Sequence, residues 1–312
     1  MVLKLLDEYN FHIKNLFLFA SEKSKGKTIY FKGIDYLVEI LTEDSFNNMD
    51  FVFFCGGTKV SKEWAMIAEA SGAYVIDNSS YFRMDEDICL IVPNVNFNSY
   101  NYKRKIISNP NCSTIQSVVV LNALKKFNIK RIIYTTYQAV SGSGMKGIND
   151  LKNTINGEKE NYYPYNISKT CIPQIDVFLD NGYTKEEVKM IEETKKILNL
   201  NDVDITATCV RVPVENSHAV SMVVEFEGEC SIEEILFSLR KQENLIVLDD
   251  YPTSIHSNGN DNIYVGRIRK DLSKNNSYLF YCVADNIRVG AASNAVKIAL
   301  EIIKKSCSKS IA

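Results

Sequence analysis

A cysteine stands at the predicted start of a helix, inside the segment that runs from Ser108 to Thr114. Proline can neither donate to a strand ladder nor sit inside a helix, so Pro110 ends the strand over 105–107 and a helix over 115–127 follows. Unpaired N–H groups and the positive dipole end at a helix start favour an anionic thiolate, the nucleophilic form of cysteine. We interpret Cys112 as a candidate nucleophile, and a buried structural cysteine is the alternative.

A nucleophile of this kind works with a group that handles protons, usually a histidine. The chain has three histidines, and His12 and His256 lie in polar turns. His218 follows Arg211 by seven residues in the connection between two predicted strands, so both side chains could face one site. A surface histidine near a structural arginine is the alternative.

Charged residues at two further places suit an anionic or zwitterionic ligand. Glu186 and Lys189 lie three apart on a predicted helix over 183–200, which Thr184 begins. That spacing presents a carboxylate and an ammonium together, although a solvated surface ion pair has the same spacing. Arg83 follows an aromatic pair at a strand exit, where an anion site and a snorkelling arginine are equally consistent.

Three loops are rich in glycine or hydroxyl groups and follow predicted strands. They are Ala20 to Gly26, Gly56-Gly57-Thr58 and Tyr137 to Gly144. Hydroxyl, lysine and backbone N–H groups in such loops hold phosphates, but a solvated tight turn has the same composition.

Composition narrows the class of protein. The chain has 312 residues, which favours two domains, and a net charge of −2 with 24% charged residues, which gives no basic surface for nucleic acid. No apolar run approaches the roughly 18 residues of a membrane span, and the first residues do not resemble a signal peptide. Eight cysteines without CxxC or metal spacing predict free thiols in the cytoplasm, and no metal site. We expect a small-molecule partner, no nucleic acid and no membrane.

The elements that must position these residues divide into two patterns. In the first part, short apolar strands and a helix over 61–70 predict βαβ units and a mostly parallel sheet of α/β type; these strands are expected over 16–19, 28–31, 51–55, 73–76 and 89–92. After Cys112, longer strands predict an α+β domain with an antiparallel or mixed sheet, which often carries a dimer interface; these strands are expected over 131–136, 204–212, 219–227, 263–268 and 278–283. The end helix, over 291–304, is expected to return to the first domain.

Several motifs together resemble the bacterial aspartate-semialdehyde dehydrogenases, in the same order and from about Leu5 to about Ala299. They are 77–84, 108–114, 137–144, 211–218, 266–271 and 285–292. The resemblance implies a Rossmann-like NADP-binding domain, residues 1–111 completed by 287–312, and a catalytic and dimerisation domain, residues 112–286. It also implies a homodimer.

The resemblance implies a role for each matching residue. The catalytic group is Cys112, which matches the thioester nucleophile, with His218 as acid/base and Gln138 orienting the substrate. Substrate binding falls to Arg211 for the carboxylate, Glu186 for the ammonium, and Asn111. Inorganic phosphate is assigned to Arg83 and Lys189. The NADP contacts are Lys23, Ser24, Ser141, Gly142 and Asn286.

The activity that the resemblance implies is the NADP-dependent, phosphate-dependent interconversion of L-aspartate 4-semialdehyde and L-4-aspartyl phosphate, in lysine, threonine and methionine biosynthesis. Two alternatives stay open. One is a reductase acting on N-acetylglutamyl phosphate, which the free-ammonium site of Glu186 argues against. The other is a non-enzymatic binding or oligomerisation protein.

The sequence departs from the family at its beginning. The family starts with an apolar strand and a Gly-x-x-Gly-x-x-Gly phosphate loop before the helix that here starts near Met1, and neither is present. That loop carries the cofactor pyrophosphate. We therefore expect the chain as written to bind NADP weakly and to expose strand edges, unless Met1 is an internal methionine taken for the start.

Overall fold

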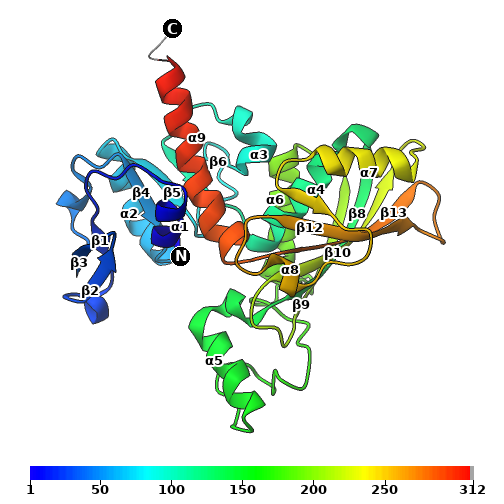
Figure 1. The fold of residues 1–312 in the computed structure, drawn as a ribbon, viewed down its shortest axis with the longest axis horizontal. Helices are drawn as coiled ribbons and strands as arrows, with labels where there is room; N and C mark the ends of the chain where they lie inside the picture. Colours follow the sequence, from blue (N-terminus) through cyan, green and yellow to red (C-terminus); the bar gives the residue numbers. More distant parts are fainter. Residues whose placement is uncertain (310–312) are drawn as a thin grey trace. The chain divides into compact units, whose positions relative to one another are not determined.

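The computed structural model describes residues 1–309, which form two compact units (Figure 1). The first unit comprises Met1–Pro93, Phe97–Asn109 and the described chain from Ala292 onward. The second comprises Asn94–Asn96 and Pro110–Ala291. The first unit therefore takes in both the start and the end of the described chain, and Cys112 lies near the start of the long segment of the second.

The first unit contains a parallel sheet of four strands in the order β4-β5-β7-β6. Its strands are β4 (Phe51–Phe54), β5 (Tyr74–Asp77), β6 (Cys89–Leu90) and β7 (Ile106–Ser108). Their apolar residues are buried because helices cover both faces, as the continuous apolar runs predict. On one face, Leu5, Val296 and Ala299 pack with Ile76 and Ile107. On the other, Ala65 packs with Phe54 and Val75.

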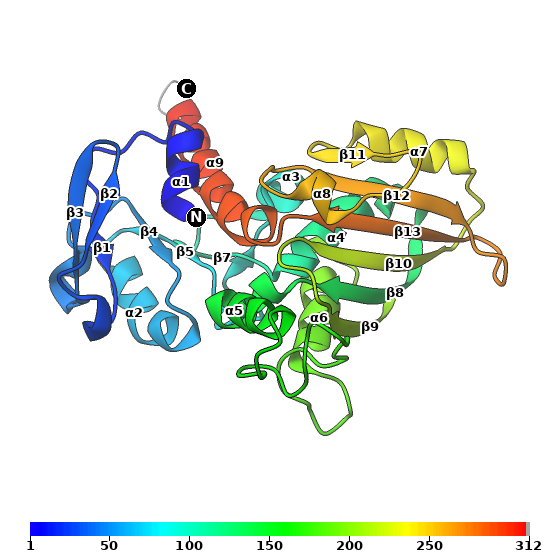
Figure 2. The same cartoon turned by 60° about the horizontal axis from the view of Figure 1, so that its bottom comes forward.

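The helices of this unit come from distant parts of the sequence. They are α1 (Val2–Glu8), α2 (Thr58–Ala70) and α9 (Asn294–Lys309). Figure 2 shows α1 and α9 side by side, and they pack through the apolar cluster that contains Leu5 and Val296. The end helix begins a few residues later than predicted because a π-helical turn, Arg288–Ser293, precedes it. The short α3 (Pro93–Asn96) follows β6, and its residues Asn94–Asn96 belong to the second unit.

A second sheet in the first unit differs from the prediction. Strands β1 (Leu18–Phe19) and β2 (Thr28–Phe31) do not pair with the parallel sheet but flank β3 (Ile34–Glu39), which the sequence analysis missed. Strands β2 and β3 form a hairpin whose two linking residues, Lys32 and Gly33, have φ of 48° and 84°. Positive φ at both positions gives the turn twist that suits antiparallel strands, and Lys-Gly is a weaker signal for it than Asn-Gly.

The second unit is built on one six-stranded sheet in the order β11-β12-β13-β10-β8-β9. The strands are β8 (Ile129–Gln138), β9 (Asp204–Arg211), β10 (His218–Phe226), β11 (Leu245–Val247), β12 (Ile263–Lys270) and β13 (Ser277–Ala284). Central β10 is antiparallel to β8 and β13, whereas β8–β9 and β11–β12 are parallel. The sheet is therefore mixed, as predicted.

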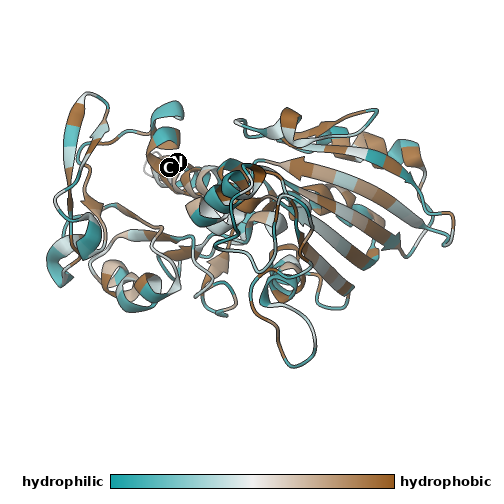
Figure 3. Cartoon of the chain, turned by 90° about the horizontal axis from the view of Figure 1, so that it is seen from below, coloured by the Kyte–Doolittle hydropathy of each residue, from teal (hydrophilic) through white to brown (hydrophobic). Residues whose placement is uncertain are grey.

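Helices lie on one face of this sheet. They are α4 (Cys112–Leu124), α6 (Lys185–Leu198) and α7 (Ile232–Lys241). Side chains that point toward them, such as Ile132, Tyr134 and Val220, are fully buried. The opposite face carries Tyr137, Ser221 and Tyr281, which are at least partly exposed. Figure 3 shows hydrophobic and hydrophilic segments mixed along these strands.

The helices of the second unit were only partly predicted. Thr184 begins α6 as expected, in a capping box with Glu187 in which each side chain accepts from the other residue's backbone N–H. Two helices were not predicted: α7, which a similar box of Ser231 and Glu234 begins, and α5 (Gly144–Ile155), which follows the glycine-rich loop. The short α8 (Ser254–Ser257) lies in the predicted polar loop.

Candidate active site

The first residue of α4 is Cys112, as the position of Pro110 predicts. The preceding residue, Asn111, caps the helix: its Oδ1 accepts from the backbone N–H of Ser113 at 3.0 Å and of Thr114 at 3.3 Å. The cap satisfies two of the helix's unpaired donors and fixes where the helix begins. Cys112 is half-buried at this helix start.

A glycine from the end of the second unit passes directly beside the cysteine. A Cβ added to Gly290 would lie 2.6 Å from the Cβ and 3.0 Å from the Cα of Cys112. Only glycine allows the backbone to approach this closely. Residue 290 therefore shapes the surroundings of the thiol, although it is not among the predicted site residues.

Three adjacent strand ends bring Gln138, Arg211 and His218 together. Parallel pairing of β8 and β9 sets Gln138 opposite Arg211, and antiparallel pairing of β8 and β10 sets Tyr137 opposite Ala219, the neighbour of His218. All three side chains are at most 5% exposed. The alternative of a surface histidine with a structural arginine is therefore wrong for His218.

One backbone residue holds both Arg211 and His218. The N–H of Ala139 donates to Nδ1 of His218 at 3.0 Å, and the carbonyl of Ala139 accepts from Nη1 of Arg211. Because Nδ1 accepts, the neutral ring carries its proton on Nε2. That Nε2 is buried without a hydrogen-bond partner in the described part of the chain. Burial, and then the nearby charge of Arg211, lower the pKa of His218 well below its usual 6.5, so the ring is neutral near pH 7.

The loop after β8 lies against this pair. A Cβ added to Gly142 would lie 2.8 Å from Nη1 of Arg211 and 3.2 Å from Nε2 of His218. The neighbouring Ser141 Oγ accepts from Nδ2 of Asn286 at 2.9 Å and lies 3.1 Å from Oδ1 of Asn216. The structure thus brings the predicted residues Ser141, Gly142 and Asn286 close to the strand-end cluster.

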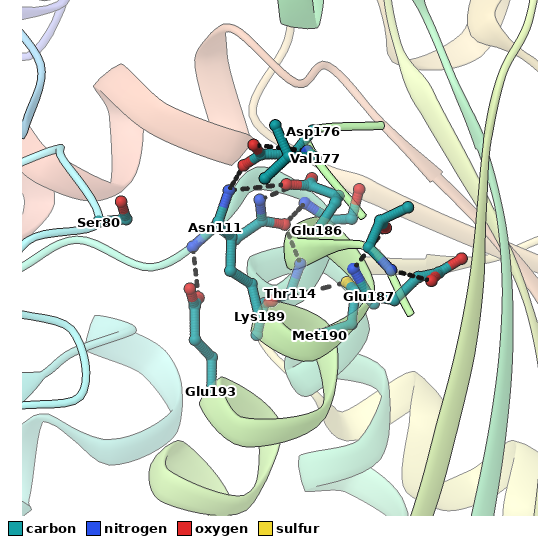
Figure 4. A network of polar contacts seen from close by, with 12 residues as sticks. Ser80, Asn111, Thr114, Asp176, Val177, Glu186, Glu187, Lys189, Met190 and Glu193 are labelled. Atoms are coloured by element: carbon teal, nitrogen blue, oxygen red, sulfur yellow. Dashed lines mark hydrogen bonds and ion pairs between the residues drawn. The ribbon is translucent and has the colours of Figure 1, made fainter. Parts of the chain in front are cut away.

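The carboxylate of Glu186 joins α6 to this cluster (Figure 4). Its Oε1 accepts from Nδ2 of Asn111 at 2.8 Å and from Nε2 of Gln138 at 3.2 Å, and its Oε2 lies 3.2 Å from Nζ of Lys189. The carboxylate is buried, so the alternative of a solvated surface pair is wrong here.

Lys189 is shared between two carboxylates. Its Nζ lies 2.8 Å from Oδ2 of Asp176 and 3.2 Å from Oε2 of Glu186. Burial alone would lower the pKa of Lys189, but these two negative charges outweigh it and raise the pKa. The ammonium is therefore a fixed positive charge next to the Glu186 carboxylate.

Sequence reasoning missed the contacts that two further carboxylates on the same helix make with distant backbone N–H groups. Oε2 of Glu193 accepts from the backbone N–H of Asn111 at 2.6 Å, and Oε1 of Glu187 accepts from the backbone N–H of Cys209 at 3.0 Å. Residues 186 and 193 are seven apart, so both lie on one helix face, together with the buried Met190. The repeat of acidic residues on an otherwise buried face of α6 is the sequence signal that could have indicated these carboxylates.

The remaining predicted site residues belong to the first unit. Arg83 is buried and its Nη2 donates to the carbonyl of Asn78 at 3.0 Å. The side chain of Lys23 is exposed, and that of Ser24 is half-buried, in a short 3₁₀ turn, Glu22–Ser24. The alternative of a snorkelling, solvated arginine is wrong for Arg83 because its side chain is not in solvent.

Comparison with known proteins gives the same family over both units. Residues 1–102 match a family model described as "Semialdehyde dehydrogenase, NAD binding domain", and residues 121–289 match "Semialdehyde dehydrogenase, dimerisation domain". The aspartate-semialdehyde dehydrogenase of Aquifex aeolicus is 46% identical over 97% of this chain and 94% of its own.

Two solved structures are similar as well. Aspartate-semialdehyde dehydrogenase II of Vibrio cholerae, in complex with ASA, has a TM-score of 0.93 and 41% identity, with 97% of this chain and 94% of the other covered. The enzyme of Candida albicans with NADP has a TM-score of 0.74 and 25% identity, with the same shares covered. With this identity along nearly the whole chain, and with family models matched over both units, the chain belongs to the aspartate-semialdehyde dehydrogenase family.

Proposed function

We propose that this chain interconverts L-aspartate 4-semialdehyde and L-4-aspartyl phosphate, with NADP and inorganic phosphate, in lysine, threonine and methionine biosynthesis. One observation carries the proposal: Arg211, His218 and Glu186 are buried in the same unit as Cys112, and they are held by hydrogen bonds to Ala139, Gln138 and Asn111. These groups match the chemical parts of an amino-acid aldehyde. Family membership supports the same activity.

Substrate recognition falls to two opposite charges. The planar guanidinium of Arg211 suits a bidentate contact with the α-carboxylate, and Glu186 suits the α-ammonium. Gln138 and Asn111 both donate to Glu186, and so fix where that carboxylate points. An acetylated amine would lose the charge attraction of Glu186, which favours a substrate with a free ammonium.

The reaction begins with Cys112. In the oxidative direction its thiolate attacks the aldehyde carbon, which gives a thiohemiacetal oxyanion. The Nε2–H of His218 is oriented by the Ala139 bond at Nδ1 and donates to that oxygen, stabilising the charge that develops there. Loss of a hydride then leaves a thioester on Cys112, and attack by phosphate on that thioester releases the acyl phosphate and restores the thiolate.

Phosphate binding is assigned to Lys189 and Arg83. Lys189 suits a dianionic phosphate because the Lys189 ammonium is a fixed positive charge. It lies next to Glu186, the side chain assigned to the substrate ammonium. Phosphate would compete with Asp176 for that ammonium. Arg83 is the other residue assigned to phosphate, by its place in the family motif, and its guanidinium suits a phosphate through paired N–H donors.

NADP is assigned to Lys23, Ser24, Ser141, Gly142 and Asn286. The chemistry of these side chains fits the cofactor. The exposed Lys23 and the hydroxyl of Ser24 suit a phosphate group of NADP, and the hydroxyl of Ser141 with the amide of Asn286 suits its carboxamide. When bound, NADP supplies the hydride acceptor of the reaction.

The two domains are proposed to divide this work. Residues 1–111 with 287–312 bind NADP, and residues 112–286 carry catalysis and dimerisation; the compact units and the matched dimerisation model support this division. The outer sheet face with Tyr137 and Tyr281, whose rings lie 6.2 Å apart, is the surface proposed for the homodimer. Exposed thiols such as Cys55 and Cys171 support a reducing, cytoplasmic location. No helix among residues 1–309 is long and apolar enough to cross a membrane.

The experiment is a steady-state assay of the purified full chain. L-aspartate 4-semialdehyde, NADP and inorganic phosphate are mixed, and NADPH absorbance is followed with and without phosphate. We expect phosphate-dependent NADPH formation that is lost in Cys112→Ala. The semialdehyde of N-acetylglutamate serves as the competing substrate, because it lacks the free ammonium.

Two outcomes would contradict the proposal. Preference for the acetylated substrate would assign the chain to the reductase of N-acetylglutamyl phosphate. The other outcome is that neither substrate is turned over and that Cys112→Ala changes no measurable function of the chain. That result would favour a binding or oligomerisation role.

A further inference from the structure

The residue before His218 has an unusual backbone. Ser217 has φ of 75°, in the left-handed region that residues with a side chain rarely adopt, and its side chain is almost fully buried. It is not a glycine, for which this conformation would carry no steric penalty. A conformation of this kind persists only where the surroundings enforce it.

Three polar contacts hold Ser217 in place. Its backbone N–H donates to Oδ1 of Asn286 at 2.9 Å, and its Oγ donates to Oδ1 of Asn258. Ser257 Oγ in turn donates to Ser217 Oγ at 2.8 Å. The partners come from two separate segments, the loop around α8 and the loop after β13, so Ser217 is fixed from two directions.

A buried carboxylate ties those two segments together. Oδ2 of Asp285 accepts from Nδ2 of Asn216 and from the backbone N–H of Gly259, each at 2.9 Å. Its Oδ1 accepts from the backbone N–H groups of Ile287 and Arg288, also at 2.9 Å. Asp285 therefore ties together the two segments that hold Ser217.

The backbone angle at Ser217 sets the direction in which the chain enters β10. His218 is the first residue of that strand and pairs with Ala284 on β13. Rotation of φ at residue 217 to a negative value would turn the Cα–Cβ bond of His218 away from the strand-end cluster. The Nε2 of the ring would then leave the position next to Arg211 and Gly142.

We propose that Ser217 is a positioning residue for His218, held in a left-handed conformation by Asn286 and Asn258 so that Nε2 of the histidine points at the reacting oxygen. The inference rests on the proposed function, since it takes His218 to donate to the substrate. It also links the predicted cofactor contact Asn286 to the histidine through a single backbone N–H.

The test compares Ser217→Ala with Ser217→Gly in the full chain. Both variants lose the Oγ contacts, but only alanine keeps a Cβ that opposes positive φ. We expect kcat to fall about 10- to 100-fold in Ser217→Ala, and roughly threefold or less in Ser217→Gly. KM for the aldehyde and for NADP should change by less than about twofold in both, because Arg211 and Glu186 are not moved.

The matched control is Asn260→Ala, in the same loop as Asn258. The amide of Asn260 donates to the carbonyl of His256 and does not contact Ser217. This variant should keep the wild-type kcat, whereas Asn258→Ala should lose activity in the same sense as Ser217→Ala.

Two results would overturn the inference. Equal kcat in the alanine and glycine variants would show that the backbone conformation at 217 is irrelevant, and an effect on KM alone would place Ser217 in binding. Failure of the proposed function is separable, because the ring ¹⁵N and ¹H resonances of His218, assigned with His218→Asn, report the position of the ring without turnover. Identical His218 resonances in wild type and Ser217→Ala would also contradict the inference.

Discussion

The predicted site residues of the two units differ in how they are held. In the second unit, Gln138, Glu186, Arg211 and His218 are buried, and all four form hydrogen bonds to other site residues or to Ala139. In the first unit, Lys23 and Ser24 stand in a short 3₁₀ turn, and the Lys23 side chain is exposed. The residues assigned to the substrate and to proton handling are thus held in place by the fold, and the two assigned to a cofactor phosphate are not.

This difference follows from what each group must do. Stabilising a transition state requires donors and charges that already point at the reacting atoms, because reorganising them during the reaction would cost the energy they supply. A phosphate contact in water is satisfied by many lysine rotamers and contributes little from any one of them. Substitutions should therefore have large effects in the second unit and small ones in the Glu22–Ser24 turn.

The largest effect is expected from Cys112→Ala. Without the thiolate no thioester forms, so kcat should fall by at least about 10⁴-fold. Steady-state NADPH formation measures this. Cys171→Ser, which alters an exposed thiol of the same unit, is the control and should keep wild-type activity. Comparable loss in both variants would mean that Cys112 is not the nucleophile.

A smaller but substantial effect is expected from Arg211→Lys. Lysine keeps the charge but lacks the planar fork, so kcat/KM for the aldehyde should fall about 10- to 100-fold, mainly through KM. Thermal unfolding should be compared in parallel, because Arg211 also donates to the Ala139 carbonyl. Near-normal KM in a folded variant would remove Arg211 from the carboxylate site.

His218 should make folding stability depend on pH. The folded pKa of His218 is well below 6.5, whereas the unfolded ring has its usual value, so below pH 6.5 only the unfolded chain gains a proton. The free energy of unfolding therefore falls as pH drops from 6.5. Between pH 7.5 and 5.5 this contribution is about 1.4 kcal/mol and is absent in His218→Asn. Urea unfolding at both pH values tests it; equal pH dependence in the two proteins would contradict burial of a neutral ring.

The smallest effect is expected from Lys23→Ala. Loss of one exposed cation should raise KM for NADP about threefold, leave kcat unchanged, and have less effect at high salt. Lys4→Ala is the control: its ammonium lies 3.5 Å from Glu8 on an exposed helix surface and is not assigned to NADP. A loss of kcat in Lys23→Ala would show that the turn is as preorganised as the catalytic cluster.

The elements that the sequence predicted well have strong local signals. Helix α6 begins with a capping box, and α4 begins after a proline and an Asn cap, so their starts are encoded within a few residues. The mixed sheet of the second unit followed from long apolar strands. By contrast, β3 was missed because its Lys32-Gly33 turn is a weak signal, and α5 because glycines open it.

The site shows the same division. Cys112, Arg211 and His218 were identified from their residue types, their spacing and the family motifs around them. The contacts that orient them were not predicted. Glu193 contacts a residue that is distant in sequence, and the role of Ser217 depends on its backbone angle. The repeat of acidic residues on α6 marks Glu193 as unusual, but it does not identify the Asn111 N–H, 82 residues away in sequence, from which that carboxylate accepts.

By itself the sequence determined where helix α4 begins, which residue opens it and which family the motifs resemble, because caps, prolines and motif spacing act locally along the chain. Only the tertiary structure decided that Glu186 is buried and accepts from Asn111 and Gln138. It also decided that the Ala139 backbone fixes the tautomer of His218 and that Ser217 sets the direction of the His218 ring. These depend on strand register and on packing between distant segments, and each hydrogen bond there is satisfied only when the whole sheet has formed.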